Sequence, residues 1–346
     1  MVRKKQKILN KEIIYLDILK VFACFMVIVN HTNIYMLNYK SFSNTLFYCF
    51  MHALCKVGVG LFLMITGVLV LDKSYSYKKI IHCIFRVFIP VFFLSLLFYI
   101  KDTGIHNINI ISFFKSFLSA PYILPYWYIY ALIGIYLVLP FIQKMLKNFT
   151  NQDYVIFILF FLIIPTLLNL FKTYFHISID PNWQLAFFSV IIAYMICGNY
   201  LSKIIISKKY LIIAFIIFIV SYVGMFFSIF FPYLNNGEIS YALDSCEAFP
   251  VVLMTISLFY IVRYFFENKE YSKRFISIVT MISSTTFGIY LIHTAFNYKL
   301  YQFSMMQKLF QFNGIIAITI LDFMVFIVCM IITYVLKKIP FIKKFL

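Results

Sequence analysis

Charged residues are scarce in this sequence. Asp, Glu, Lys and Arg make up 12% of its 346 positions and hydrophobic residues 63%, whereas a soluble globular domain carries about 25% charged residues. A soluble domain is therefore excluded. Alternating polar and apolar stretches of about ten residues, which mark the strands of outer-membrane barrels, are also absent. The composition predicts an all-α membrane protein.

Cysteine pairs and nucleotide-binding motifs are missing as well. The seven cysteines are scattered without a Cys-x-x-Cys pair, so we expect neither disulfides nor a metal site. The sequence has no P-loop, no Gly-rich dinucleotide fingerprint and no Gly-x-Ser-x-Gly elbow, which leaves nucleotide hydrolases and elbow-type esterases without support. We also find no internal repeat. No tightly bound cofactor is expected.

Hydrophobic runs fill most of the chain, and each is near or above the ~20 residues that a membrane-spanning helix needs. The runs cover residues 13–36, 47–71, 80–100, 126–146, 154–172, 184–206, 210–232, 242–265, 275–297 and 314–336. The run 242–265 is the least typical, because Asp244 and Glu247 fall in its first turns. We predict about ten transmembrane helices in a single membrane-embedded domain, residues 1–346.

The basic residues are placed unevenly along the chain. Lys and Arg number 30 against 12 acidic residues, a net charge of +18. They fill alternate connections between the runs and the short termini 1–12 and 337–346, as the positive-inside rule requires of cytoplasmic segments. The pattern predicts that both termini are cytoplasmic. It assigns the basic excess to orientation and to contact with anionic membrane lipids, so no nucleic-acid partner is expected.

An acid, a base and an imidazole share one face of the first hydrophobic run. Asp17, Lys20, Cys24 and His31 return to nearly the same side of a helix at about 100° per residue. Ionisable groups are costly in hydrocarbon, so this stripe should face a bundle interior or a wet cavity. Asp17 and Lys20 lie close enough to the start of the helix to snorkel as anchors instead. His31 lies well over half-way across and is the first candidate for chemistry.

Four segments together carry a family pattern. In the first, Lys20 and His31 are separated by ten residues; the others run from Lys56 to Lys73, from Pro125 to Gln143 with Trp127 near its start, and from Thr286 to Phe296 with Tyr290 and His293 as Tyr-x-x-His. In this order they resemble the acyltransferase-3 family of integral-membrane acyltransferases, in which Arg is commoner than Lys at the first position. The pattern is most similar to that of stand-alone bacterial enzymes that O-acetylate surface polysaccharides.

The resemblance implies a donor side and a catalytic base. His31 would take the proton of an acceptor hydroxyl as that hydroxyl attacks a thioester, a task that suits neutral imidazole. Acetyl-coenzyme A is the expected co-substrate, and its phosphates need cations at the inner mouth of the site. Lys20 and Arg86, with Asp17 beside them, are predicted in or near the inner half and are assigned to donor binding.

The remaining candidates lie in the predicted outer half and are assigned to the acceptor or to support of the site. They are Trp127, Lys56, Glu247, Tyr290 and His293. A histidine at the position of His293 is more often an interfacial residue than a catalyst. A tryptophan at the position of Trp127 is more often an anchor in the aromatic belt. Asp244 and Glu247 either orient a histidine or a sugar or form an exposed rim. No role is assigned to His52, His82, His106 and His176.

Two functions remain from the sequence. The first is transfer of acetyl from cytoplasmic acetyl-coenzyme A to a hydroxyl of a surface or lipid-linked polysaccharide, by an enzyme of the cytoplasmic membrane. The second is a transporter or exporter of such a polysaccharide or its lipid-linked precursor, because intramembrane charges also mark substrate pathways. Transporters tend to have repeated halves and broken helices, and the sequence indicates neither.

Overall fold

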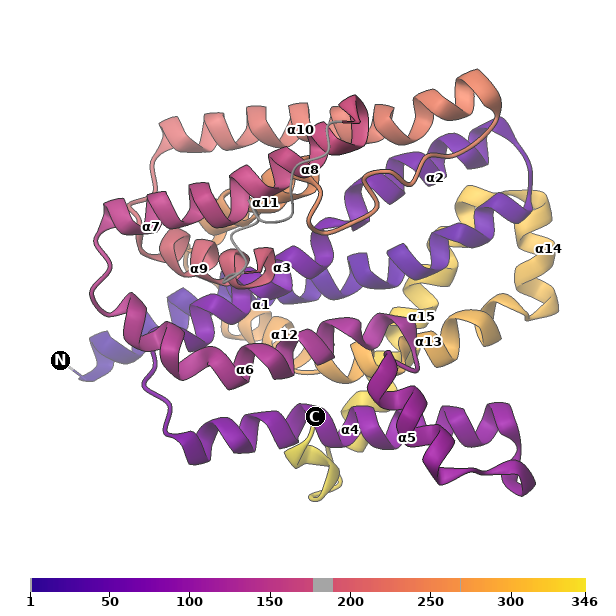
Figure 1. The fold of residues 1–346 in the computed structure, drawn as a ribbon, viewed down its shortest axis with the longest axis horizontal. Helices are drawn as coiled ribbons and strands as arrows, with labels where there is room; N and C mark the ends of the chain where they lie inside the picture. Colours follow the sequence, from indigo (N-terminus) through magenta and orange to yellow (C-terminus); the bar gives the residue numbers. More distant parts are fainter. Residues whose placement is uncertain (1, 177–188, 268) are drawn as a thin grey trace. The chain divides into compact units, whose positions relative to one another are not determined.

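The computed structural model describes residues 2–176, 189–267 and 269–346, and over these ranges it contains helices and no strand (Figure 1). The predicted all-helical class is therefore confirmed. The contacts divide the chain into two compact units. Unit 1 comprises Met1–Val70 and Phe149–Met330, and unit 2 comprises Leu71–Asn148 and Ile331–Leu346. The candidate residues on the first hydrophobic run lie in unit 1.

Eight helical segments of the described chain are long and apolar enough to cross a membrane, and a bent pair of helices makes nine. They are Ile14–Asn38, Phe42–Val70, Tyr77–Thr103, Leu124–Leu146, Asn151–Phe175, Lys208–Asn236, Phe249–Phe266, Gly314–Leu336 and the pair Lys273–Ser283 with Thr286–Tyr301. The predicted run 184–206 begins outside the described residues, and its described part holds α9 (Val190–Lys203). About ten spans thus agrees with the structure, while the cytoplasmic placement of both termini stays a prediction.

One predicted helix begins later than its hydrophobic run. The run 242–265 was expected to form helix from its first residues, but α11 spans Phe249–Phe266 and carries a Pro in its first turn. Asp244 and Glu247 therefore lie in the segment before the helix rather than in its first turns. The reason is that these carboxylates favour a polar setting, and Pro250 supplies the fixed backbone angle that suits the start of a helix.

Broken helices, which the sequence did not indicate, are present in unit 1. Residues 275–297, expected as one span, form α12 (Lys273–Ser283) and α13 (Thr286–Tyr301), which are bent by 52°. At the bend the hydroxyls of Ser284, Thr285 and Thr286 each donate to the carbonyl three residues before. Such bonds compete with the helical ladder and bend or end a helix.

Two further spans are each divided into successive helical segments. Phe42–Val70 consists of α2 (Phe42–Cys55) and α3 (Val57–Val70), which meet at Lys56. Asn151–Phe175 consists of α7 (Asn151–Ile158), the π-helical turn η4 (Leu159–Ile163) and α8 (Ile164–Phe175). The first of these breaks places a Lys side chain inside a predominantly apolar span.

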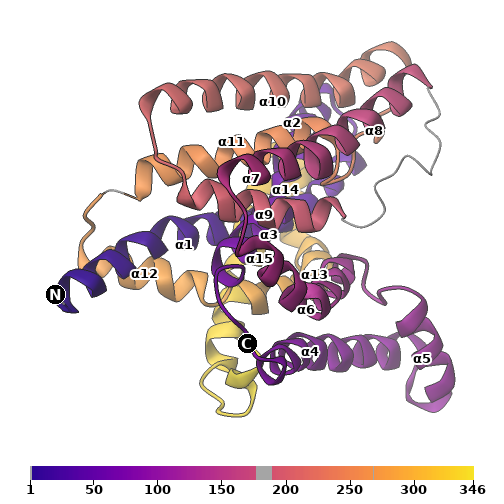
Figure 2. The same ribbon diagram turned by 60° about the vertical axis from the view of Figure 1, so that its left-hand side comes forward.

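The core of unit 1 is built around α1 (Val2–Thr32), which continues into the 3-10 helix η1 (Asn33–Asn38). α1 packs against α3, α12 and α13, and α3 lies beside α9 (Figure 2). Gly67 of α3 and Gly198 of α9 sit at this crossing, where a Cβ on either would overlap the backbone of the partner helix. Small residues permit such close approach between membrane helices.

The rest of unit 1 and unit 2 complete the helical inventory. Unit 1 also contains α10 (Lys208–Asn236), α14 (Ser304–Phe312) and most of α15 (Gly314–Leu336). Unit 2 contains α4 (Tyr77–Thr103), η2 (Ile105–Asn107), α5 (Ile110–Ser119), η3 (Leu124–Tyr126), α6 (Trp127–Leu146) and η6 (Ile342–Lys344). Its core is aromatic, with Phe113 and Phe117 of α5 buried against Phe92 of α4.

Candidate active site

Asp17, with Lys20 beside it on α1, forms a polar contact between α1 and α12. The Asp17 side chain is buried, and its carboxylate accepts hydrogen bonds from Ser283 Oγ at 2.6 Å, from Thr280 Oγ1 at 3.1 Å and from Lys20 Nζ at 3.2 Å. Lys20 itself stays partly exposed. The predicted stripe does turn inward here, because Cys24 is also buried and meets the carbonyl of Thr286. Two of the three donors lie on α12, so the buried carboxylate holds the two helices together.

His31 and His293 face each other where α1 and α13 meet. Their ring centroids are 5.4 Å apart and the rings are tilted by 38°. Ile28 and Ile289, about one turn before them, belong to the same buried cluster and seat the two helices. His31 is partly exposed, whereas the side chain of His293 is fully buried among helices rather than open to a headgroup layer. The structure thus places His31, the predicted catalytic base, beside His293, for which the sequence favoured an interfacial position.

The protonation of His293 follows from its neighbours. Its Nδ1 lies 2.6 Å from the carbonyl oxygen of Tyr290, and because a carbonyl can only accept, Nδ1 carries the proton. Nε2 then keeps its lone pair, and this buried atom has no hydrogen-bond partner within the described chain. An imidazole held in one tautomer with an unpaired acceptor nitrogen is suited to receive a proton. The carbonyl of Tyr290 therefore positions His293.

Other buried polar atoms near the two histidines also lack partners. Thr294 Oγ1 and Asn297 Oδ1 on α13 and Asn33 Oδ1 at the start of η1 have no hydrogen bond among the residues described. Buried polar atoms are normally paired, since an unsatisfied one costs about 1–3 kcal/mol. A concentration of such atoms beside a histidine pair is typical of a site that completes its hydrogen bonds with water or a substrate.

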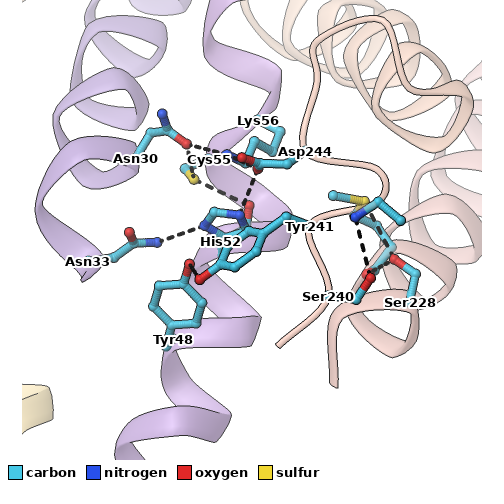
Figure 3. Close-up of polar contacts among 12 residues, drawn as sticks. Asn30, Asn33, Tyr48, His52, Cys55, Lys56, Ser228, Ser240, Tyr241 and Asp244 are labelled. Atoms are coloured by element: carbon cyan, nitrogen blue, oxygen red, sulfur yellow. Dashed lines mark hydrogen bonds and ion pairs between the residues drawn. The ribbon is translucent and has the colours of Figure 1, made fainter. Parts of the chain in front are cut away.

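A second polar cluster joins α1, α2 and the segment before α11 (Figure 3). Asp244 accepts from His52 Nε2 at 2.8 Å and pairs with Lys56, whose Nζ also donates to Asn30 Oδ1 at 2.7 Å. Burial would raise the pKa of the Asp244 carboxyl, but the hydrogen bond from His52 and the charge of Lys56 outweigh it and hold the pKa at about 2. Asn30 directly precedes His31, so this cluster touches the turn that carries it.

His52, Asn30 and Asn33 take part in these contacts although the sequence analysis gave them no role. Asn33 Nδ2 lies 3.4 Å from His52 Nδ1, and His52 reaches Asp244 across 192 positions of the chain. No local pattern marks such a pair. Asp322 of α15 was also missed; it is buried and accepts from Thr32 Oγ1.

The other predicted site residues are more dispersed. Tyr290 is buried and acts through its carbonyl, and Glu247 is half-buried, with burial raising the pKa of its carboxyl. Arg86 of α4 and Trp127 at the start of α6 are exposed and belong to unit 2, away in sequence from the histidine pair. Unit 1 therefore brings together His31 and His293, while the roles of Arg86 and Trp127 stay predictions.

A known protein family matches most of the chain. Residues 13–334 match the model of a family described as an acyltransferase domain, the acyltransferase-3 family. The matched range includes all four segments of the sequence pattern and both histidines of the pair. No curated protein and no solved structure matches the chain.

Proposed function

Because the chain belongs to the acyltransferase-3 family, we propose that it transfers acetyl from acetyl-coenzyme A to a hydroxyl group of a surface or lipid-linked polysaccharide. Family membership and the many apolar helices carry the coarser statement: the protein is a membrane-embedded O-acyltransferase that uses an acyl donor and an acceptor. The acetyl group, the coenzyme A carrier, the glycan acceptor and the bacterial cytoplasmic membrane are the parts that we infer.

The observation that supports this chemistry best is the contact between His31 and His293. In the proposed reaction the acceptor hydroxyl gives its proton to His31 as its oxygen bonds to the thioester carbonyl. The C–S bond then breaks, and the departing thiolate takes the proton back. Such a positioned base contributes roughly 10²–10⁴-fold to the rate. His293, with its proton fixed on Nδ1, offers a second acceptor nitrogen in the same buried region.

Lys20 supports a donor side at the other end of α1. His31 lies eleven positions after it in the chain, which is about 16 Å along a helix axis. A cation that remains partly exposed can meet an anionic donor while the thioester reaches the histidines. Arg86 stays a donor-binding candidate from the sequence alone.

The test uses purified protein in detergent with acetyl-coenzyme A and a de-O-acetylated polysaccharide. We expect thiol release that depends on the glycan, together with a mass increase of the glycan by one acetyl group per transfer. His31→Gln, prepared at matched protein level, should abolish both signals. Absence of thiol release and of acetylated glycan with the parent protein would refute the proposal.

Transport remains a second candidate, because the break between α12 and α13 is the kind of interruption that transporters use at substrate sites. The two functions separate in sealed vesicles containing the purified protein. Movement of glycan across the vesicle membrane without any thioester would support transport. Transfer that requires the thioester, with no glycan movement, would support the enzyme.

A further inference from the structure

Two cavities open at one end of unit 1, and they share a wall. The larger, of about 680 Å³, is lined by Lys40, Ser41, Phe42, Tyr233, Glu238 and Tyr241 among others. The smaller, of about 480 Å³, is lined by Lys40 and Ser41 again, with Tyr39, Asn44, Gln311 and Asn313. We propose that the two form one extended groove that binds the acceptor as an oligosaccharide several sugars long. This inference rests on the proposed glycan acceptor and adds where and how that acceptor is held.

The chemistry of the lining matches carbohydrate. Sugars present apolar C–H faces together with many hydroxyls, so they fit sites that combine aromatic rings with hydrogen-bonding groups. Tyr233 and Tyr241 supply rings with polar tips in the larger cavity. Gln311 and Asn313 supply amide donors and acceptors in the smaller one. Apolar side chains such as Phe42 and Phe312 also line the cavities, and they offer surfaces on which the C–H faces of sugars can pack.

The groove is formed by three chain segments that are distant in sequence, each made of a connection and the adjoining helix ends. Residues 37–45 run from the end of η1 into the start of α2. Residues 233–241 include the end of α10 and the segment after it, and residues 310–315 include the junction of α14 and α15. In unit 1 these segments gather at one end, at the right of Figure 1. The alternation of basic connections predicts that all three lie outside the cytoplasm, which is where a surface or lipid-linked glycan is presented.

Contacts connect the groove wall to the turn that carries His31. The ring of Tyr241 packs edge-on against His52 with centroids 5.8 Å apart, and its hydroxyl lies 3.3 Å from that of Tyr48. Three residues later Asp244 is held by His52 and Lys56, and Lys56 bonds Asn30. Figure 3 shows this series of contacts from Tyr241 to Asn30. The polar cluster therefore fixes one wall of the groove to α1, next to His31.

An acceptor that occupies both cavities should bind more tightly than one that occupies either. The probes are fragments of the source organism's own surface polysaccharide, de-O-acetylated and graded from a single sugar to several repeat units. We expect their affinity for the purified protein, measured by calorimetry in detergent, to rise with length until both cavities are filled. Failure of every fragment to bind the parent protein, or affinity that does not change with length, would overturn the groove.

Substitutions locate the binding. Tyr233→Ala and Gln311→Ala should each weaken binding of the longest fragment by roughly 5–10-fold, as loss of about one good polar or stacking contact does. Tyr233→Phe keeps the ring and should retain most affinity, which separates loss of contact from misfolding. Tyr210→Ala is the matched control, since Tyr210 is exposed at the opposite end of the same helix, α10. Unchanged affinity in both alanine variants of the groove would place the glycan elsewhere.

These experiments can refute the proposed groove and the proposed reaction independently of each other. Fragment binding that responds to length and to Tyr233→Ala, without thiol release from acetyl-coenzyme A, would keep the groove and refute acyl transfer. Acetylation of fragments at a rate independent of their length and unaffected by Tyr233→Ala would keep the transferase and refute the groove.

Discussion

The two ends of α1 handle buried polar groups in opposite ways. Near its start Asp17 is buried with three donors on its carboxylate, from Ser283, Thr280 and Lys20. At its other end His293 Nε2 and Asn33 Oδ1 are buried and have no hydrogen-bond partner in the described parts of the chain. Both ends pack against the same broken span, α12 at the first and α13 at the second.

This difference distinguishes polar groups that stabilise the packing of helices from polar groups that are available to a substrate. A satisfied buried carboxylate stabilises the contact between its helices and has little capacity left for a ligand. Unsatisfied buried atoms cost free energy in the folded protein, and such costs persist where a substrate or water completes the bonds. We therefore assign helix packing to the Asp17 end of α1 and the reaction to the His31 end. The experiments below test that assignment.

The largest effect is expected at His31. Replacing it with Gln keeps much of the size but removes the ability to accept a proton near neutral pH, so transfer to an acceptor hydroxyl should fall by about 10²–10⁴-fold. Acetylated glycan is measured by mass shift at matched protein level. His106→Gln, an exposed histidine in η2, is the control and should leave activity unchanged. Normal acetylation by His31→Gln would remove general-base catalysis from this residue.

The variant His293→Gln tests whether the histidine on α13 takes part in the reaction or only in helix packing. Because Nε2 of His293 is buried and unpaired beside His31, we expect the turnover rate per folded molecule to fall by about 10²-fold, at the lower end for a proton-transfer group. Thermal unfolding of each preparation gives the folded fraction. Unchanged turnover with a lowered melting temperature would mean that His293 only packs the helices.

Asp17→Asn should act on stability instead. The amide keeps the shape but loses the charge on which three donors converge, so the free energy of unfolding should fall by about 1–3 kcal/mol. Thermal unfolding in detergent measures it. Asp102→Asn is the control, because that carboxylate is exposed and accepts from Tyr122; its effect should stay within about 0.5 kcal/mol. An Asp17 variant with parent stability but lost donor binding would reverse the assignment of this end.

Substitution of Lys20 tests whether the Asp17 end of α1 takes part in the reaction. Lys20→Met should weaken acetyl-coenzyme A binding by about tenfold, as loss of one charge-assisted contact does, whereas Lys20→Arg should be tolerated. Equilibrium binding of the donor to purified protein is the measurement. Lys115→Met, an exposed cation in α5, controls for general loss of positive charge. Donor binding by Lys20→Met equal to the parent would leave Lys20 as an anchor at the membrane surface.

The smallest expected effect is the pH response of the cluster around Asp244. Its pKa is lowered from the usual 3.8 to about 2 in the folded protein, so its contribution to stability is complete above about pH 3.8 and is lost as the pH falls towards 2. Melting temperatures of the parent should therefore drop across this interval more than those of Asp244→Asn. Parallel curves for the two proteins would show that the contacts with His52 and Lys56 add no net stability.

Much of the scaffold was predictable from the sequence, because each span must satisfy its backbone within one helix and so leaves a long apolar run. The run 314–336 coincides with α15, and the inward stripe of α1 followed from helical periodicity. Interruptions were not predictable in the same way. The bend between α12 and α13 depends on hydroxyl groups that bond backbone carbonyls locally, and the apolar run continues across it.

The sequence by itself determined the membrane class, the approximate number of spans and the family pattern, because these depend on composition and on local motifs within the helices. The choice of His31 as the base follows from the family pattern and stays a prediction. Only the tertiary structure decided which distant groups meet. It paired His31 with His293, brought His52 and Lys56 to Asp244, and gathered three chain segments around two cavities. Helix packing sets these contacts, and residues hundreds of positions apart leave no shared period in the sequence that would reveal them.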